Sequence, residues 1–177
     1  NDIVSVPLIF FGQTMPSLLN PFAWAHVFIK NEKVLRKPYH YDVVVAELGT
    51  DGPGQIAAFA RYLKVDLAVV TAIAPEHMEY FKNLDAVASE EFSVADFSDQ
   101  LLVNADLCDA KYYKKLTDKV MTYGQKAGSD FVINKPKFTK AGTTFVVNDM
   151  KLSMDALGLG EIYSATAAVA VATNQDF

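Results

Sequence analysis

A carboxylate and an imidazole near the ends of two apolar runs are the first indication of chemistry in this sequence. Glu47 closes the run 42–48 (DVVVAEL), and His77 follows the run 67–73 (LAVVTAI). If these runs are neighbouring parallel strands, their carboxyl ends meet at the sheet edge where such sheets bind ligands. A carboxylate and a neutral imidazole suit Mg²⁺ or Mn²⁺ beside phosphate oxygens. The competing interpretation is structural, with Glu47 as a cap or ion-pair partner and His77 as a hydrogen-bonded surface or core residue.

The elements that would position these two residues follow from the apolar pattern. Runs 42–48 and 67–73 are continuous rather than alternating, which is typical of strands covered on both faces in a parallel sheet. Between them, residues 53–64 place apolar side chains on one helical face, so the three segments predict a strand–helix–strand unit. The apolar residues 3–11 are too few to span a bilayer, which takes about 20, and predict another buried strand.

Alternating helices and strands are predicted as far as residue 128. In chain order the expected elements are a helix at 84–97, a strand at 100–104, a short helix at 110–116 and a strand at 119–123. Together with the preceding unit they predict an α/β fold with a mostly parallel sheet flanked by helices.

The pattern changes after Gly128. Three β-branched runs joined by turn residues predict an antiparallel meander, with strands at 130–134, 143–148 and 151–154. The alanine-rich residues 161–173 predict a last helix packed closely against the sheet. We therefore expect one domain over residues 1–177, with the parallel core at about 1–128 and the meander and last helix at about 129–177.

Composition limits the classes of function. The chain is 51% apolar and 21% charged with a net charge of −5, which indicates a soluble globular protein and offers no overall basic surface to nucleic acid. The basic run 111–115 (KYYKK) is better explained as a solvated helix face. The lone Cys108 cannot form a disulfide within the chain, which indicates a reducing, cytoplasmic location, and we expect it to be a small buried thiol rather than a nucleophile.

Short motifs in a consistent order resemble the central domain of the Mur ligases. Residues 41–49 and 53–56 (YDVVVAELG, PGQI) resemble the family's "E-x-G … G-E-I" strand and helix start. Residues 71–81 (TAIAPEHMEYF) resemble its "T-N-I-x-x-D-H-L-E-x-F" segment. Further resemblances are LLVNAD at 101–106, MTYG at 121–124 followed by SD at 129–130, the segment 142–147 and the alanine-rich last helix. The resemblance runs from about residue 14 to residue 173 and implies the fold of a P-loop NTPase-like central domain.

The resemblance also implies an activity. Segments 47–54 and 77–81 are most similar to the ligase that adds D-alanyl-D-alanine to a UDP-muramoyl tripeptide, while ligases of folate polyglutamylation, cyanophycin synthesis and lipid II amidation share the domain. In this family ATP phosphorylates a substrate carboxylate, and an incoming amine attacks the acyl phosphate. The expected function is thus ATP-dependent amide formation in peptidoglycan precursor synthesis, with ATP and Mg²⁺ as cofactors, an amino acid or dipeptide as amine, and no nucleic acid or membrane insertion.

Site residues follow from the same resemblance. Glu47 would hold the Mg²⁺ shared with the ATP phosphates, and His77 would hold a second Mg²⁺ near the acyl phosphate. Asn20 matches an asparagine region on the side that binds the UDP-linked substrate; the alternative is that Asn20 caps a turn before Phe22. The position of the family's carbamylated lysine falls at Glu91, an anion that could replace the carbamate; the alternative is an exposed helix glutamate.

The sequence departs from the family pattern in two further places. It contains no G-x-x-G-K-[ST] phosphate loop, which in the family precedes the point where this sequence starts. We therefore expect an N-terminally truncated chain, inactive by itself, that lacks an N-terminal and a C-terminal domain. The residues that face the nucleotide in relatives are replaced by Gly160, Glu161 and Ser164. The second hypothesis is accordingly a degenerate, non-catalytic member that acts as a scaffold or binds a partner.

Overall fold

The structure is a computed structural model that describes residues 3–116 and 119–174. The chain divides into two compact units, Asn1–Asp51 and Gly52–Phe177. The organisation of the chain as one domain remains a prediction.

The first unit contains two helices, α1 (Val6–Ile9) and α2 (Pro21–Leu35). The prediction of a buried strand at residues 3–11 is wrong, because this segment forms α1 and turns. Pro7 explains the difference: it has no N–H for a sheet ladder, but it is tolerated in the first turn of a helix, where it lies in α1. Helix α2 is mostly exposed, with Val27 as its buried residue.

The predicted strand at residues 42–48 is also wrong. The described residues 3–51 contain no strand, so run 42–48 has no strand of its own unit with which to form a sheet ladder. Val43 and Val45 are exposed, which is the reverse of the burial that the sequence predicted. The first strand of the predicted strand–helix–strand unit is therefore not formed.

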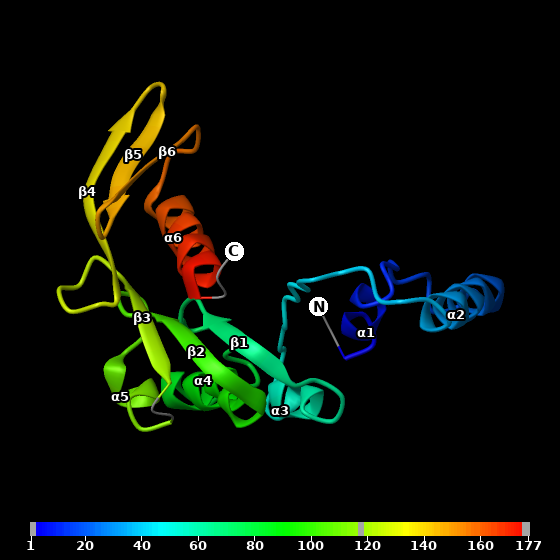
Figure 1. Cartoon of the computed structure of the whole chain (residues 1–177). Coiled ribbons are helices and arrows are strands. Elements are labelled where there is room, and N and C mark those ends of the chain that lie inside the picture. Colours follow the sequence, from blue (N-terminus) through cyan, green and yellow to red (C-terminus); the bar gives the residue numbers. More distant parts are fainter. Residues whose placement is uncertain (1–2, 117–118, 175–177) are drawn as a thin grey trace. The chain divides into compact units, whose positions relative to one another are not determined.

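The second unit contains a single six-stranded sheet (Figure 1). Its strands are β1 (Val65–Val70), β2 (Ser98–Asn104), β3 (Val120–Gly124), β4 (Phe131–Thr139), β5 (Gly142–Val147) and β6 (Met150–Met154). They lie in sequence order; β1 to β4 pair in parallel, and β4 to β6 pair antiparallel. This confirms the predicted fold class, a mostly parallel α/β sheet ending in an antiparallel meander.

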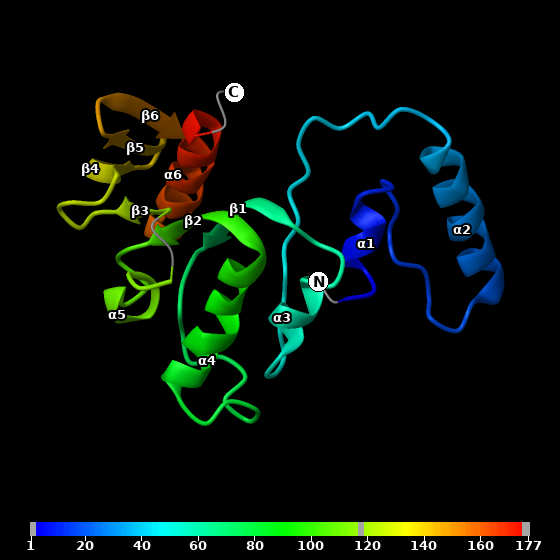
Figure 2. The ribbon, with the colours of Figure 1, turned by 60° about the horizontal axis from the view of Figure 1, so that its bottom comes forward.

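Helices cover both faces of the parallel strands (Figure 2). The helical elements of this unit are α3 (Gln55–Phe59), α4 (Leu84–Glu91), the 3₁₀ helix η1 (Phe92–Phe97), α5 (Ala110–Tyr113) and α6 (Leu159–Asn174). Helix α6 packs on one face, where Leu102 and Tyr123 belong to the same buried cluster as Ile162 and Ala170. Helices α3, α4 and α5 lie on the other side of the sheet (Figure 2). Among the described residues, every helix is too short or too polar to cross a membrane.

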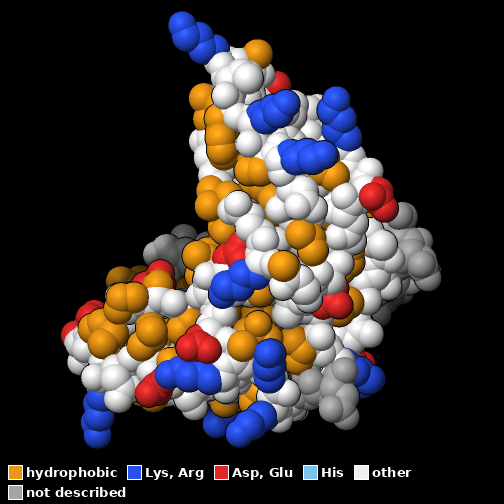
Figure 3. Space-filling model, turned by 90° about the vertical axis from the view of Figure 1, so that its left-hand side faces the viewer, with side chains coloured by type: hydrophobic (Ala, Val, Ile, Leu, Met, Phe, Trp, Pro, Cys, Tyr) orange, Lys and Arg blue, Asp and Glu red, His pale blue; other side chains and the backbone are white. Residues whose placement is uncertain are grey.

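Strand β5 alternates between buried and half-buried side chains. Thr143, Phe145 and Val147 of β5 are buried, whereas Thr144 and Val146 between them are half-buried. Lysine side chains gather over these strands in the upper part of Figure 3. Lysines in this part of the sequence are Lys135, Lys137, Lys140 and Lys151. The meander is therefore held by its apolar inner face and carries positive charge outside.

Candidate active site

The loops after β1, β2 and β3 lie at one edge of the sheet, because these neighbouring strands are parallel. The loop after β1 is tied to the loop after β2, because the Ile73 N–H donates to the Leu107 carbonyl at 3.2 Å. This is the edge at which open parallel sheets bind ligands. These loops and the neighbouring helices position the side chains of the candidate site.

His77 lies in the loop between β1 and α4. Its φ of 51° lies in the left-handed region, which few residues other than glycine adopt. The His77 carbonyl accepts hydrogen bonds from the backbone N–H groups of Tyr80 (2.8 Å) and Phe81 (3.2 Å), and Phe81 is buried. The imidazole is 41% exposed, and its Nδ1 lies 4.0 Å from a carboxylate oxygen of Glu79. The loop backbone is thus anchored, and the ring is accessible to a ligand.

Glu47 is an exposed residue of the first unit, whereas His77 belongs to the second. Their expected roles as ligands of two different Mg²⁺ ions therefore remain predictions for each residue separately. Within residues 3–116 and 119–174, no group of three or more His, Cys, Asp or Glu side chains could hold a metal ion by itself. Mg²⁺ in phosphoryl-transfer sites is usually held by one or two carboxylates together with substrate phosphates, so the available donors suit such a shared site.

Glu91 ends helix α4 and is half-buried rather than exposed. Burial raises the pKa of the Glu91 carboxyl, and the negative charges of Glu90 and Glu76 raise it further. Glu76 directly precedes His77, so the loop after β1 and the end of α4 place acidic groups near one another. A proton or a cation near Glu91 would relieve this unfavourable charge. This environment suits the predicted role of Glu91 beside a metal, a role that remains a prediction.

Glu90 is a residue of this region whose importance the sequence did not reveal. It is only 7% exposed, and its two oxygens accept hydrogen bonds from the backbone N–H groups of Gly54 (2.6 Å) and Ile56 (2.7 Å). The helical spacing contained a signal, since Glu90 lies three residues after Val87, a buried residue of α4. Glu90 therefore faces the core, where a carboxylate needs partners.

Asp106 follows β2 and organises the loop after β3. Its carboxylate accepts hydrogen bonds from the backbone N–H groups of Gln125 (2.5 Å) and Lys126 (3.0 Å) and from the Tyr163 hydroxyl (2.9 Å). Gly124 makes this approach possible, because a Cβ at that position would lie 2.8 Å from the carboxylate. Asp106 is thus fully engaged as an acceptor and joins the loops after β2 and β3 to α6.

A similar contact involves Asp130, of the SD motif that precedes β4. One oxygen of Asp130 accepts hydrogen bonds from the backbone N–H and the hydroxyl of Thr122, at 2.7 and 2.9 Å. Both residues belong to the segments that resembled the family pattern. Their role in this structure is to join β3 to the beginning of β4.

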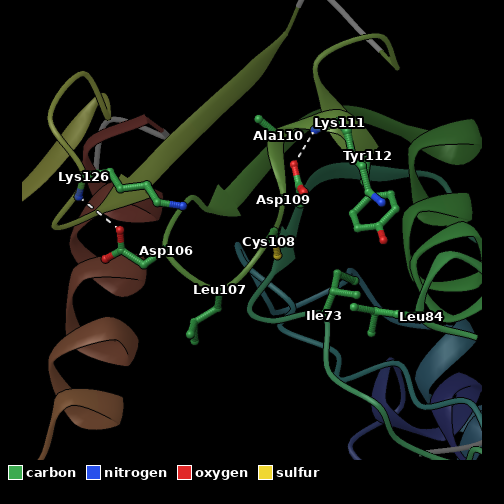
Figure 4. Close-up of a pocket in the computed structure, with 10 residues that line it drawn as sticks. All are labelled: Ile73, Leu84, Asp106, Leu107, Cys108, Asp109, Ala110, Lys111, Tyr112 and Lys126. Carbon is green, nitrogen blue, oxygen red and sulfur yellow. Dashed lines mark hydrogen bonds between the residues drawn. The ribbon is translucent and has the colours of Figure 1, made fainter.

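A hollow of about 560 Å³ opens between the loop after β2 and α5 (Figure 4). Asp106, Cys108, Lys111 and Lys126 are among the residues that line it. The Cys108 thiol is buried, and burial raises its pKa to about 12, so it is protonated at neutral pH. The prediction of a small buried thiol is confirmed. Lys111 is paired with Asp85 at 2.9 Å, which agrees with a solvated helix face.

The remaining residues that the sequence singled out are Asn20 and three residues near the start of α6. The Asn20 side chain caps α2 by accepting a hydrogen bond from the Ala23 N–H at 3.0 Å, so the expected cap is confirmed, while its substrate-binding role remains a prediction. Gly160, Glu161 and Ser164 all lie in α6, near its start, where the Ser164 hydroxyl donates to the Gly160 carbonyl at 3.1 Å.

Comparison with known proteins decides the family. The sequence profile described as the Mur ligase middle domain matches residues 29–172. The chain belongs to the Mur ligase family. Its relatives include a UDP-N-acetylmuramoyl-tripeptide–D-alanyl-D-alanine ligase from Escherichia coli (strain K12), which is 31% identical over 148 residues. That match covers 78% of this chain and 33% of the relative. The ligase of the same name from Bacillus subtilis (strain 168) is 24% identical over 150 residues, which cover 77% of this chain and 31% of the relative. This Mur ligase chain therefore spans about a third of the length of these relatives.

Solved structures of other Mur ligases share the fold. MurF from Acinetobacter baumannii aligns with a TM-score of 0.71 at 17% identity, over 83% of this chain and 34% of that one. MurF from Thermotoga maritima in complex with ADP aligns with a TM-score of 0.67 at 17% identity, over 91% of this chain and 38% of that one. At 17% identity these alignments establish the Mur ligase fold alone. The roles of individual residues rest on their contacts and environment.

Proposed function

We propose that this chain is the central domain of an ATP-dependent ligase that joins D-alanyl-D-alanine to a UDP-muramoyl tripeptide. The observation that carries the proposal is the match of the Mur ligase middle domain over residues 29–172. Three relatives, 24–31% identical, bear the name of this ligase, which supports the choice of substrates. The cytoplasmic location predicted from the sequence belongs to the same proposal.

The proposed reaction has two steps. A carboxylate oxygen of the UDP-linked peptide attacks the γ-phosphorus of ATP, and the bond to the departing ADP breaks to leave an acyl phosphate. The amine of the dipeptide then attacks the acyl carbon, inorganic phosphate departs, and the nitrogen loses a proton as the amide forms. Bound Mg²⁺ would neutralise the charge of the transferring phosphoryl group.

Three residues of the chain would act at the phosphates. We assign Glu47 to the Mg²⁺ that the ATP phosphates share and His77 to a second Mg²⁺ near the acyl phosphate. Glu91 would take the place of the family's carbamylated lysine. The environment of Glu91 supports its role: half-buried and close to the charges of Glu90 and Glu76, it gains from a nearby cation.

Asn20 and further domains would complete the substrate site. The Asn20 Oδ1 is engaged in the α2 cap, so we assign any contact with the UDP-linked substrate to its Nδ2. The phosphate loop and the domain that closes over the nucleotide would come from other parts of a longer protein, since the chain spans about a third of its relatives.

A non-catalytic scaffold is the second candidate function. The observation that favours it is the set of replacements at Gly160, Glu161 and Ser164, where relatives have residues that face the nucleotide. A scaffold of this kind would keep the fold and bind a partner without turning over ATP.

The experiment that separates the two candidates is an assay of the full-length protein for ADP release. The ligase proposal predicts repeated turnover, with one amide product for each ADP released, only when ATP, Mg²⁺, UDP-muramoyl tripeptide and D-alanyl-D-alanine are all present. The absence of product with every combination of muramoyl peptide and amine would contradict the ligase and favour the scaffold.

A further inference from the structure

Glu90 joins two helices that are far apart in the sequence. Its carboxylate belongs to α4, and the two backbone N–H groups that donate to it, those of Gly54 and Ile56, lie 36 and 34 residues earlier at the start of α3. Both distances, 2.6 and 2.7 Å, are those of strong hydrogen bonds to a charged acceptor. We call this arrangement the Glu90 latch.

The backbone at Gly54 is shaped to make the latch. Gly54 has a φ of 84°, in the left-handed region that glycine adopts without strain, and it directly precedes α3. Its N–H and the N–H of Ile56 reach the same carboxylate, one at each oxygen. The carboxylate thereby satisfies two N–H groups that have no partner within the first turn of α3.

The latch lies within an apolar contact. Ile56 and Phe59 of α3 are 2% and 1% exposed, and Val87 and Ala88 of α4 are also buried. Burying a carboxylate in such surroundings costs more free energy than burying an apolar side chain of similar size. The carboxylate fixes the position of α3 relative to α4, because two short hydrogen bonds are directional. Apolar contacts alone would allow the two helices to shift against each other.

The same residue also restrains the backbone next to Glu91. The Glu90 carbonyl accepts a hydrogen bond from the Ser93 hydroxyl at 2.6 Å, where α4 passes into η1. Glu91 is therefore flanked by a residue whose side chain and carbonyl are both engaged. Any movement of the latch would move the point from which the Glu91 carboxyl projects.

We propose that Glu90 is a positioning residue of the ligase site, which holds Glu91 in place by locking the end of α4 to the start of α3. This inference rests on the proposed function. Glu90 itself does not touch substrate, because both of its oxygens are engaged by the protein backbone. It acts through the placement of Glu91, and removal of the latch should lower turnover more than it lowers affinity for the UDP-linked substrate.

The test compares three variants of the full-length protein. Glu90→Gln keeps the size of the side chain but replaces one accepting oxygen by a donor, so one latch hydrogen bond is lost. Glu90→Asp keeps the charge on a shorter side chain. Val87→Ala is the matched control, because it removes buried methyl groups from the same helix and leaves the latch intact. Amide hydrogen exchange at Gly54 and Ile56 reports the latch, and kcat and KM for ligation report the site.

We expect Glu90→Gln to speed exchange at Gly54 or Ile56 and to lower kcat by about 10- to 100-fold with little change in KM. Glu90→Asp should lie between this variant and the wild type in both measurements. Val87→Ala should retain the wild-type kcat even where its thermal stability falls as far as that of Glu90→Gln.

Three results would overturn the inference. Unchanged exchange at both amides in Glu90→Gln would show that the latch does not form. Faster exchange with an unchanged kcat, or an equal loss of kcat in Val87→Ala, would show that Glu90 serves stability alone. A wild-type protein without ligase activity would instead contradict the proposed function and with it the positioning role, whereas the exchange measurements would still test the latch.

Discussion

The parallel and antiparallel halves of the sheet are held together by different means. In the parallel half, two buried or half-buried carboxylates hold the backbone: Glu90 binds the start of α3, and Asp106 binds the loop after β3. Strands β4 to β6 are held by alternating apolar side chains such as Phe145 and Val147. Lysine side chains gather over these strands (Figure 3).

This difference follows from what each half must position. The meander needs only one apolar face, for which any well-packed set of side chains suffices. The parallel half must hold loops at the edge where the proposed ligand sites lie, and loops lack the repeated backbone hydrogen bonds of a strand. Carboxylates at fixed points supply those bonds, so a single oxygen in this half can affect both stability and function.

The largest expected effect is in the antiparallel half, with Phe145→Ala. Phe145 is 2% exposed, and its truncation leaves a cavity in the cluster beneath α6. We expect the free energy of unfolding to fall by about 3–5 kcal/mol, measured by urea denaturation. Phe138→Ala, at a side chain 51% exposed on β4, is the control and should change stability by about 0.5 kcal/mol or less. Similar losses in both variants would contradict the account of an apolar inner face.

The polar half is tested by Asp106→Ala. This change leaves the N–H groups of Gln125 and Lys126 and the Tyr163 hydroxyl without their acceptor. We expect a loss of about 3 kcal/mol in the free energy of unfolding, because hydrogen bonds to a charged group are stronger than neutral ones. Asp149→Ala, at an exposed aspartate of the antiparallel half, should be nearly neutral. Equal effects would remove the distinction between the halves.

A smaller effect, dependent on pH, is expected at Glu91. Burial and the charges of Glu90 and Glu76 raise the pKa of Glu91 in the folded chain, so its ionisation opposes folding. The stability contributed by protonated Glu91 is present below the ordinary carboxyl pKa and is lost as the pH rises through the raised value. Glu91→Gln should therefore gain stability relative to the wild type as the pH rises from about 3 to about 7.

Urea denaturation across that pH range measures the Glu91 effect. Phe138→Ala, at an exposed position of β4, changes no titratable group; it is the control and should show no comparable gain with pH. A Glu91→Gln variant whose stability relative to the wild type does not depend on pH would show that this carboxyl is not perturbed.

The sequence predicted the second unit better than the first. Run 67–73 and run 42–48 look alike, yet only the former overlaps a strand, β1 (Val65–Val70). Strand β1 pairs with β2 and buries Ala68 and Val70, whereas run 42–48 has no strand partner among the described residues of its unit. Apolar β-branched composition shows what a segment favours, but long-range partners decide whether a strand forms.

The candidate site was predictable in part. The order of motifs identified the family and pointed to His77 and Glu91, because those residues stand at fixed places in local patterns. Glu90 and Asp106 could not be assigned in the same way. Their partners are backbone N–H groups distant in sequence, which carry no residue-specific signal, and only the folded chain brings them to the carboxylates.

The most direct test of the account is ADP release by His77→Ala in the full-length protein, with ATP, Mg²⁺, UDP-muramoyl tripeptide and D-alanyl-D-alanine. His26→Ala, at another exposed histidine, is the control. If His77 holds a metal ion at the acyl phosphate, its loss should lower turnover by at least about 100-fold. Mutation of residues that only hydrogen-bond to a metal ligand already lowers activity by about 10- to 100-fold, and loss of the ligand itself should cost at least as much. Turnover in His77→Ala equal to that of His26→Ala and the wild type would contradict the account.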